Sequence, residues 1–192
     1  GVQTKVYKPS EFHRQNTNPI GNQTHFIAGD KDGNVFFDSD NSLIRYDIRT
    51  QKFSCLRKSN VYAVASIKGT IWVGIADSIL TWNPDKNDFD FVTRLENRNQ
   101  RATCLLEDSG GRYWIGTTDG LFRMNDDKSL TCMIMGEDIY DLYEDSKYNL
   151  WISIRMNGMY KRDVHGNFTR YRYDPSHPNN ISSNQVRDFV ED

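Results

Sequence analysis

Three pairs of adjacent carboxylates recur along this 192-residue chain, and carboxylates are among the groups that general acid–base catalysis uses. The pairs are Glu107-Asp108, Glu144-Asp145 and Glu191-Asp192. Each pair follows a short apolar run, and Gly111 stands three residues after Asp108. An Asp with a glycine three residues later is typical of a tight turn, because the carboxylate accepts hydrogen bonds from nearby backbone N–H groups. We therefore interpret the pairs as turn residues and expect no catalytic residues in this chain.

Arginines, amides and one carboxylate in two sets of polar loops offer a different chemistry, the binding of a ligand. The candidate ligand-binding residues are Arg155, Asn157, Arg98, Arg101, Asn60 and Asp119. A guanidinium group can hold a carboxylate or sulfate through two parallel hydrogen bonds, which would suit an acidic sugar. If these residues form a site, Arg155 and either Arg98 or Arg101 must face the same side of the molecule, near its axis. The alternative is that each of them is a solvated loop residue.

Metal and nucleophile chemistry find no support in the sequence. The four histidines lack metal-ligand spacing, and the three cysteines form no C-x-x-C pair. No G-x-S-x-G motif and no phosphate-binding loop is present. We expect no metal and no cofactor, and we interpret Cys55, Cys104 and Cys132 as small buried side chains.

The composition excludes two further classes of partner. With 24 basic and 26 acidic side chains the net charge is −2, whereas a nucleic-acid-binding domain needs clustered Lys and Arg to neutralise phosphates. No apolar run of roughly 18 residues exists, so we expect no membrane contact by this chain. Aromatic residues make up 12% of the sequence, which favours strands over helices.

An internal repeat defines the elements that position the candidate residues. Four bulky aromatic anchors, Phe36, Trp72, Trp114 and Trp151, are spaced by 36, 42 and 37 residues. Six residues before the anchors stand Asp30, Ser66, Asp108 and Asp145. Three residues before the first three anchors stand Gly33, Gly69 and Gly111. Repeats of this length are typical of four-stranded propeller blades.

Each repeat is consistent with four short strands joined by turns. An apolar run leads into an Asp-x-x-Gly or Ser-x-x-Gly turn, in which the Asp or Ser side chain bonds nearby backbone. The anchors lie in the middle of the next strand, so we expect them to pack between blades rather than stack on sugars. No segment shows the 3.6-residue periodicity of a helix. The sequence predicts an all-β propeller fragment, with about four four-stranded antiparallel blades plus partial flanking strands.

The linkers between repeats divide the chain. Residues 1–22 would hold the outer strand of a preceding blade, at Thr4–Lys8, and a linker. Blades 1 to 4 would occupy residues 23–58, 59–96, 97–135 and 136–180, and residues 181–192 the inner strand of a fifth blade. Because these are not the boundaries of an ordinary domain, we expect a piece of a longer propeller. It would form an open arc whose ends self-associate; the alternative is a closed four-bladed ring.

The third and fourth repeats share a specific sequence motif. The segment 106–123 reads LEDSGGRYWIGTTDGLFR, and the fourth repeat matches it through Tyr143-Glu144-Asp145 and Leu150-Trp151-Ile152. This pattern resembles the two-component-regulator propeller repeat, and the linker 178–186 resembles the one common between such blades. The first two repeats depart from the pattern: Phe36 replaces Trp, Asp38 replaces a glycine, and Ser66 replaces Asp.

The resemblance implies the periplasmic sensor region of a Bacteroidetes hybrid two-component histidine kinase. Such a region would recognise an oligosaccharide and relay the signal to a kinase that is absent from this chain. Two alternatives stay open, because propellers host many functions. One is an extracellular propeller enzyme, a lyase or glycosidase, whose catalytic residues lie outside this piece; the other is a protein-interaction scaffold.

Overall fold

The computed structural model describes residues 23–40, 42–177 and 180–191, and these residues form sixteen strands in four antiparallel sheets. Blade 1 contains β1 (Ile27–Gly29), β2 (Val35–Ser39), β3 (Ser42–Asp47) and β4 (Lys52–Arg57). Blade 2 contains β5 (Val61–Ile67), β6 (Thr70–Ile75), β7 (Ser78–Asn83) and β8 (Asp88–Arg94). Blade 3 contains β9 (Ala102–Glu107), β10 (Tyr113–Thr117), β11 (Gly120–Met124) and β12 (Leu130–Met135). Blade 4 contains β13 (Ile139–Glu144), β14 (Leu150–Ile154), β15 (Met159–Arg162) and β16 (Phe168–Tyr171).

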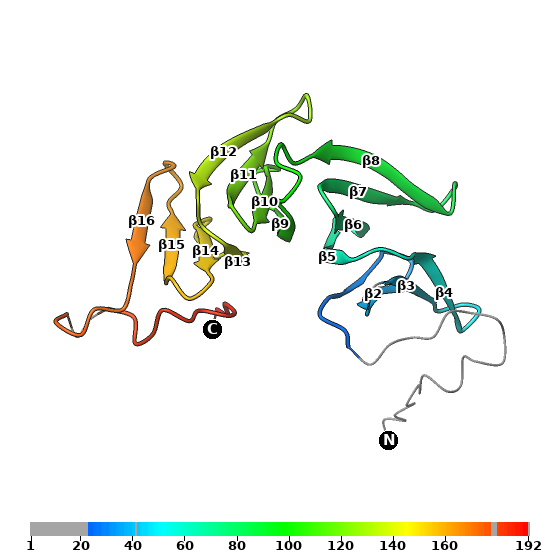
Figure 1. Cartoon of the computed structure of the whole chain (residues 1–192), viewed down its shortest axis with the longest axis horizontal. Helices are drawn as coiled ribbons and strands as arrows, with labels where there is room; N and C mark the ends of the chain where they lie inside the picture. The colour runs from blue at the N-terminus through cyan, green and yellow to red at the C-terminus, as the bar shows by residue number, and fades with distance from the viewer. Residues whose placement is uncertain (1–22, 41, 178–179, 192) are drawn as a thin grey trace, which may run out of the picture.

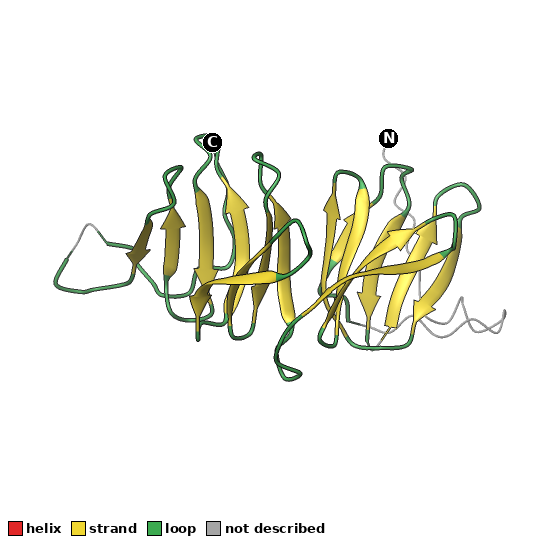
Figure 2. Cartoon of the chain, turned by 90° about the horizontal axis from the view of Figure 1, so that it is seen from above, coloured by secondary structure: helices red, strands yellow, loops and turns green. Residues whose placement is uncertain are grey.

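The blades are arranged radially around one side of a common centre. Within each blade the strands are paired in chain order, and the first strand lies innermost while the fourth lies outermost (Figure 1). Seen from above, the four sheets stand side by side with their turns gathered along two opposite edges (Figure 2). The described residues contain no helix, and therefore no helix that could cross a membrane. The predicted all-β propeller architecture is confirmed.

The arc of blades is open in Figure 1, with blades 1 and 4 at its two ends. This is the expected open arc, and the alternative of a closed four-bladed ring is not formed. The strand expected at Thr4–Lys8 lies outside the described residues, as does Asp192.

The first three aromatic anchors pack between neighbouring blades, as expected. Phe36 contacts Trp82 of blade 2 edge-on, with ring centroids 5.4 Å apart. Trp72 stacks on Tyr113 of blade 3 at 5.0 Å. Trp114 is 1% exposed and lies 5.3 Å beneath the guanidinium group of Arg162 of blade 4. Three hydrophobic clusters thus fill the three junctions between blades.

The spacing of six residues between Asp and Trp has a hydrogen-bonding cause that the pattern alone did not reveal. The indole Nε1 of Trp114 donates to Oδ2 of Asp108 at 2.8 Å, and Trp151 makes the same bond to Asp145. The other oxygen of Asp108 accepts from the backbone N–H of Arg112 across the turn. Burial alone would raise the pKa of Asp108, but the bonds from Trp114 and Arg112 hold it below its usual range. The interpretation of Asp108 and Asp145 as turn residues is confirmed. For Glu107 and Glu144 it is wrong: they are the last residues of β9 and β13 and accept hydrogen bonds from the neighbouring blades.

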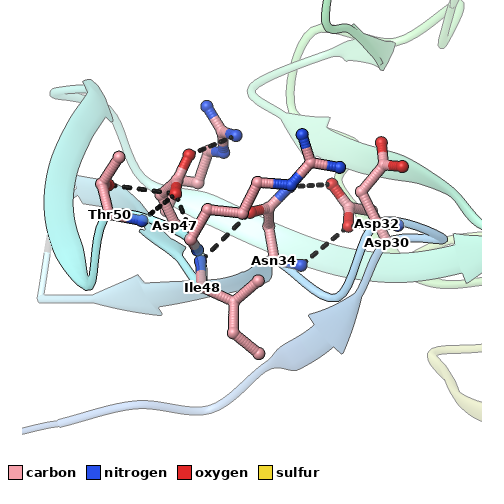
Figure 3. Close-up of polar contacts among 8 residues, drawn as sticks. Asp30, Asp32, Asn34, Asp47, Ile48 and Thr50 are labelled. Carbon is pink, nitrogen blue, oxygen red and sulfur yellow. Dashed lines mark hydrogen bonds and ion pairs between the residues drawn. The ribbon is translucent and has the colours of Figure 1, made fainter.

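In blade 1 the corresponding turn is stabilised without a hydrogen bond from a tryptophan indole (Figure 3). Asp30 accepts from the backbone N–H and the side-chain amide of Asn34, both at 2.8 Å. The amide oxygen of Asn34 then accepts from the backbone N–H of Ile48, in the turn between β3 and β4. Asp47 closes that second turn by accepting from the N–H and the hydroxyl of Thr50. The two turns are therefore joined through Asn34.

The turn in blade 2 differs from the prediction. Ser66 does not cap a turn; it lies within β5 and pairs with Ile71, as Glu107 pairs with Tyr113 in blade 3. The hairpin closes one residue later through Lys68 and Gly69, whose φ angles are 49° and 74°. Positive φ at both loop positions is typical of the two-residue hairpin turn that matches strand twist. Blade 2 therefore needs no carboxylate at this corner.

The three cysteines are free, and Cys132 is exposed rather than buried as expected, because it lies on the outermost strand of its blade. Cys55 and Cys104 are half-buried.

The segment Val186–Glu191 is not assigned as a strand, because no second strand pairs with it in the described residues. Its contacts are nevertheless the same as those that an inner strand makes with the preceding blade. Glu191 accepts from the backbone N–H and hydroxyl of Ser146, as Glu144 does from Ser109. Phe189 stacks on Tyr143 of β13 at 6.2 Å. The segment therefore lies where the inner strand of a following blade would stand.

Candidate ligand-binding cleft

The inner strands enclose a cleft of about 950 Å³, which we call the central cleft. All four blades and residue 187 contribute to its wall. The polar and aromatic residues that line it are His25, Asp38, Asp40, Asn60, Tyr62, Arg101, Thr103, Thr118, Tyr140, Asp141, Arg155 and Arg187. A concave site of this size with a few polar groups among apolar ones is typical of small-molecule binding.

Each complete inner strand has a β-bulge where it borders the central cleft. Tyr62 is the unpaired residue between Val61 and Ala63, and it lines the cleft. In β9 the unpaired residue is Thr103, and in β13 it is Tyr140. A bulge turns one side chain away from the alternation of the strand. The three bulges therefore direct one side chain from each blade into the same space.

Two further residues occupy the same structural position. His25 directly precedes Phe26, whose carbonyl oxygen accepts from the N–H of Asp38 in β2. Arg187 stands four residues before Glu191, as Tyr140 stands four residues before Glu144. Both line the central cleft, so the wall carries one equivalent residue from each of five successive inner segments.

Glycines on the second strands allow the inner strands to come this close. A Cβ at Gly74 would lie 2.8 Å from the Cβ of Ala102 in the next blade. A Cβ at Gly116 would lie 2.3 Å from Sγ of Cys104 and 2.7 Å from Ile139. Larger residues at these positions would push neighbouring blades apart and widen the central cleft.

Blade 1 carries Asp38 in place of this glycine. The Asp38 side chain is 3% exposed and accepts from the backbone N–H groups of His25 and Phe26, both at 2.7 Å. Its second oxygen lies 2.8 Å from Nδ1 of His25. Asp38 therefore holds the first inner segment in place and orients the exposed imidazole of His25 at the wall of the cleft.

Two arginines lie over the rings of the bulge tyrosines. The guanidinium carbon of Arg101 is 4.9 Å from the ring centroid of Tyr62, and that of Arg155 is 4.8 Å from the ring centroid of Tyr140. Asn60 donates from Nδ2 to the hydroxyl of Tyr62 at 3.3 Å. The hydrogen bond from Asn60 and the nearby Arg101 lower the pKa of Tyr62. Aromatic faces and hydrogen-bonding groups thus alternate along the wall.

Asp141 is a partly buried acidic group of the wall. Burial raises the pKa of Asp141, and the charge of Asp188 on the following segment raises it further. Its carboxyl group therefore favours the neutral form more than an exposed aspartate does.

The structure brings together three of the six candidate residues from the sequence. Arg155, Arg101 and Asn60 line the central cleft, and Arg155 and Arg101 therefore face one space. The other three lie outside its lining. Asn157 donates a hydrogen bond to Glu137 at 2.7 Å. The backbone N–H of Asp119 donates to the hydroxyl of Thr117, and its carbonyl oxygen accepts from the N–H of Gly136. Arg98 is exposed in the linker after β8.

The loops that follow the second strands are joined by hydrogen bonds to the linkers between blades. The N–H of Thr118 donates to the carbonyl oxygen of Arg101 at 3.0 Å, and the N–H of Arg155 donates to that of Asp138 at 2.8 Å. Sequence reasoning missed His25, Tyr62, Tyr140 and Arg187. The two tyrosines stand within apolar runs, where only a bulge reveals that their side chains leave the strand alternation.

Comparisons with known proteins agree with this architecture. Residues 98–119 match the family described as two component regulator propeller. The fold is similar to the extracellular domain of the hybrid two-component system BT3049 from B. thetaiotaomicron, with a TM-score of 0.78 and 19% identity over 98% of this chain. The corresponding domain of BT4673 gives a TM-score of 0.74 and 19% identity over 88% of this chain. The chain spans only 26% and 25% of those two domains.

Propellers with other activities are similar as well. Virginiamycin B lyase from Staphylococcus aureus gives a TM-score of 0.64 at 15% identity, covering 79% of this chain and 56% of the lyase. No curated protein matches the sequence. At these identities the structural neighbours show the fold alone.

Proposed function

We propose that this chain is the ligand-binding part of an extracytoplasmic sensor of a two-component system, and that it binds an oligosaccharide in the central cleft without chemical turnover. The observation that carries the proposal is the convergence of bulge residues. Tyrosine rings offer flat apolar faces for sugar C–H groups, while Arg101, Asn60 and Thr103 offer donors and acceptors for hydroxyls.

The match of residues 98–119 to the two component regulator propeller family supports the assignment to a two-component system. The similar fold of the extracellular domains of BT4673 and BT3049 supports it as well. Under this proposal the chain works in the periplasm. Ligand binding shifts the position of neighbouring blades, and a kinase elsewhere in the parent protein reads that shift.

A propeller lyase is the second candidate, and one observation favours it. The exposed imidazole of His25 is oriented by the buried carboxylate of Asp38, an arrangement that suits a general base. Incubation with polysaccharides, followed by mass spectrometry, separates the two candidates. The sensor proposal expects unchanged polysaccharide; cleavage that His25→Gln abolishes would instead make the chain a lyase.

The binding proposal is tested by calorimetry against a panel of neutral and acidic oligosaccharides. We expect Tyr62→Ala and Tyr140→Ala each to weaken binding about tenfold, because each removes one stacking face. The matched control is Tyr148→Ala, which removes an exposed tyrosine from the turn at the other end of β13. Absence of binding to every saccharide, or an equal loss in the control, would overturn the proposal.

A further inference from the structure

The end of the central cleft beside blade 4 differs from the rest of its wall in charge. Tyr140, Arg155 and Arg187 line the central cleft and also an adjoining hollow of about 260 Å³. The hollow is completed by Met156, Gln185 and Val186. Two guanidinium groups and one phenol therefore border both the small hollow and the larger site. We call these three residues the basic corner.

Arg155 is anchored on one edge in the basic corner. Its Nε donates to Oδ2 of Asp138 at 2.7 Å, and its guanidinium carbon lies 4.8 Å from the ring centroid of Tyr140. In the described part of the chain its two terminal nitrogens have no hydrogen-bond partner. A guanidinium group fixed on one edge presents its free nitrogens as a preorganised pair of donors.

Arg187 adds a second positive charge to the corner. Among the described residues it forms no ion pair and no hydrogen bond, although it lines both spaces. The charge of Arg155 is partly offset by Asp138. Asp141 belongs to the same wall, and burial together with the charge of Asp188 raises its pKa. Among the described residues, the corner thus offers two guanidinium groups, of which only that of Arg155 forms an ion pair.

We propose that the basic corner binds an oxyanion carried by the ligand, either the carboxylate of a uronic acid or a sulfate ester. The proposal rests on the proposed function and names the class of saccharide, an acidic one. Tyr140 would hold the ring of the charged sugar, while Arg155 and Arg187 would donate hydrogen bonds to its oxyanion from two sides.

Paired ligands test this inference directly. The first pair is trigalacturonic acid and its methyl ester, which share a skeleton but differ in charge. The second pair is a sulfated chondroitin disaccharide and its unsulfated counterpart. We expect the charged member of one pair to bind about tenfold more tightly, and the pair that shows the difference identifies the carboxylate or the sulfate.

Paired variants complete the test. Arg187→Gln and Arg155→Gln should each abolish most of that preference, because each removes a charged donor to the oxyanion. Arg98→Gln is the matched control, because it removes the same charge from an exposed linker residue outside the cleft lining. Equal binding of charged and neutral members, or an equal effect of Arg98→Gln, would overturn the inference alone. Failure to bind any saccharide would overturn the proposed function with it.

Discussion

Asp38 lies directly beneath His25 and accepts hydrogen bonds from both its backbone N–H, at 2.7 Å, and its imidazole Nδ1, at 2.8 Å. A buried carboxylate thus takes the place that a glycine fills in blades 2 and 3. In those blades the absence of a side chain lets the next inner strand approach. In blade 1 the carboxylate instead ties its own inner segment to β2.

Asp38→Ala should lower the free energy of unfolding by about 3 kcal/mol, because it leaves two backbone N–H groups without their charged acceptor. Urea denaturation followed by tryptophan fluorescence measures the change. Asp40→Asn is the control: Asp40 is exposed at the end of the same strand, and its φ of 48° suits asparagine. A loss as large in the control would show that Asp38 has no special structural role.

Acid should destabilise the fold through Asp108 and Asp145. Both carboxyl groups have folded-state pKa values below the ordinary value of 3.8, because hydrogen bonds from tryptophan and backbone outweigh the effect of burial. The stability that they contribute is therefore present above pH 3.8 and is lost as the pH falls below it towards the folded-state pKa.

The melting temperature measured from pH 7 to pH 2.5 checks this dependence. We expect Asp108→Asn to melt lower than the wild type at pH 7 and to show a shallower decline in acid. If the melting temperature of Asp108→Asn fell as steeply in acid as that of the wild type, the assigned role of the carboxylate would be contradicted.

Gly116→Ala should destabilise the junction between blades 3 and 4. The new Cβ would lie 2.3 Å from Sγ of Cys104 and 2.7 Å from Ile139, so the two blades must separate. We expect a loss of about 2–3 kcal/mol in the free energy of unfolding, the scale of overpacking in a core. Gly29→Ala is the control, because its Cβ would meet only one backbone oxygen at 3.8 Å. A neutral Gly116→Ala would mean that the glycine does not set the spacing of the blades.

The open ends of the arc should cause self-association. Ile27 on β1, at one end of the arc, is 70% exposed, and exposed apolar edge strands favour pairing with another copy. Light scattering should give a mass that rises with concentration, and Ile27→Lys should reduce it to that of a monomer. Phe91→Lys is the control, because Phe91 is 60% exposed on the outer strand β8 between the ends. A monomer at every concentration would contradict this expectation.

The sequence by itself was enough to predict the number of blades, the order of strands and the turns at Asp30, Asp108 and Asp145. These features are local: a tight turn needs its Asp and Gly within a few residues, and an apolar anchor every 36 to 42 residues marks each blade. Ser66 shows where this local reasoning fails, since strand pairing with Ile71, and not the spacing from Trp72, decides its position.

Only the tertiary structure decided which residues meet. Tyr62 and Tyr140 lie 78 residues apart in the chain and face one cleft because each occupies a bulge, which shifts the strand register by one residue. The period of two along a strand cannot show such a shift. The contacts between blades and the openness of the arc likewise depend on how distant segments are packed. Packing between blades places side chains from five inner segments around one centre, and no single repeat contains that information.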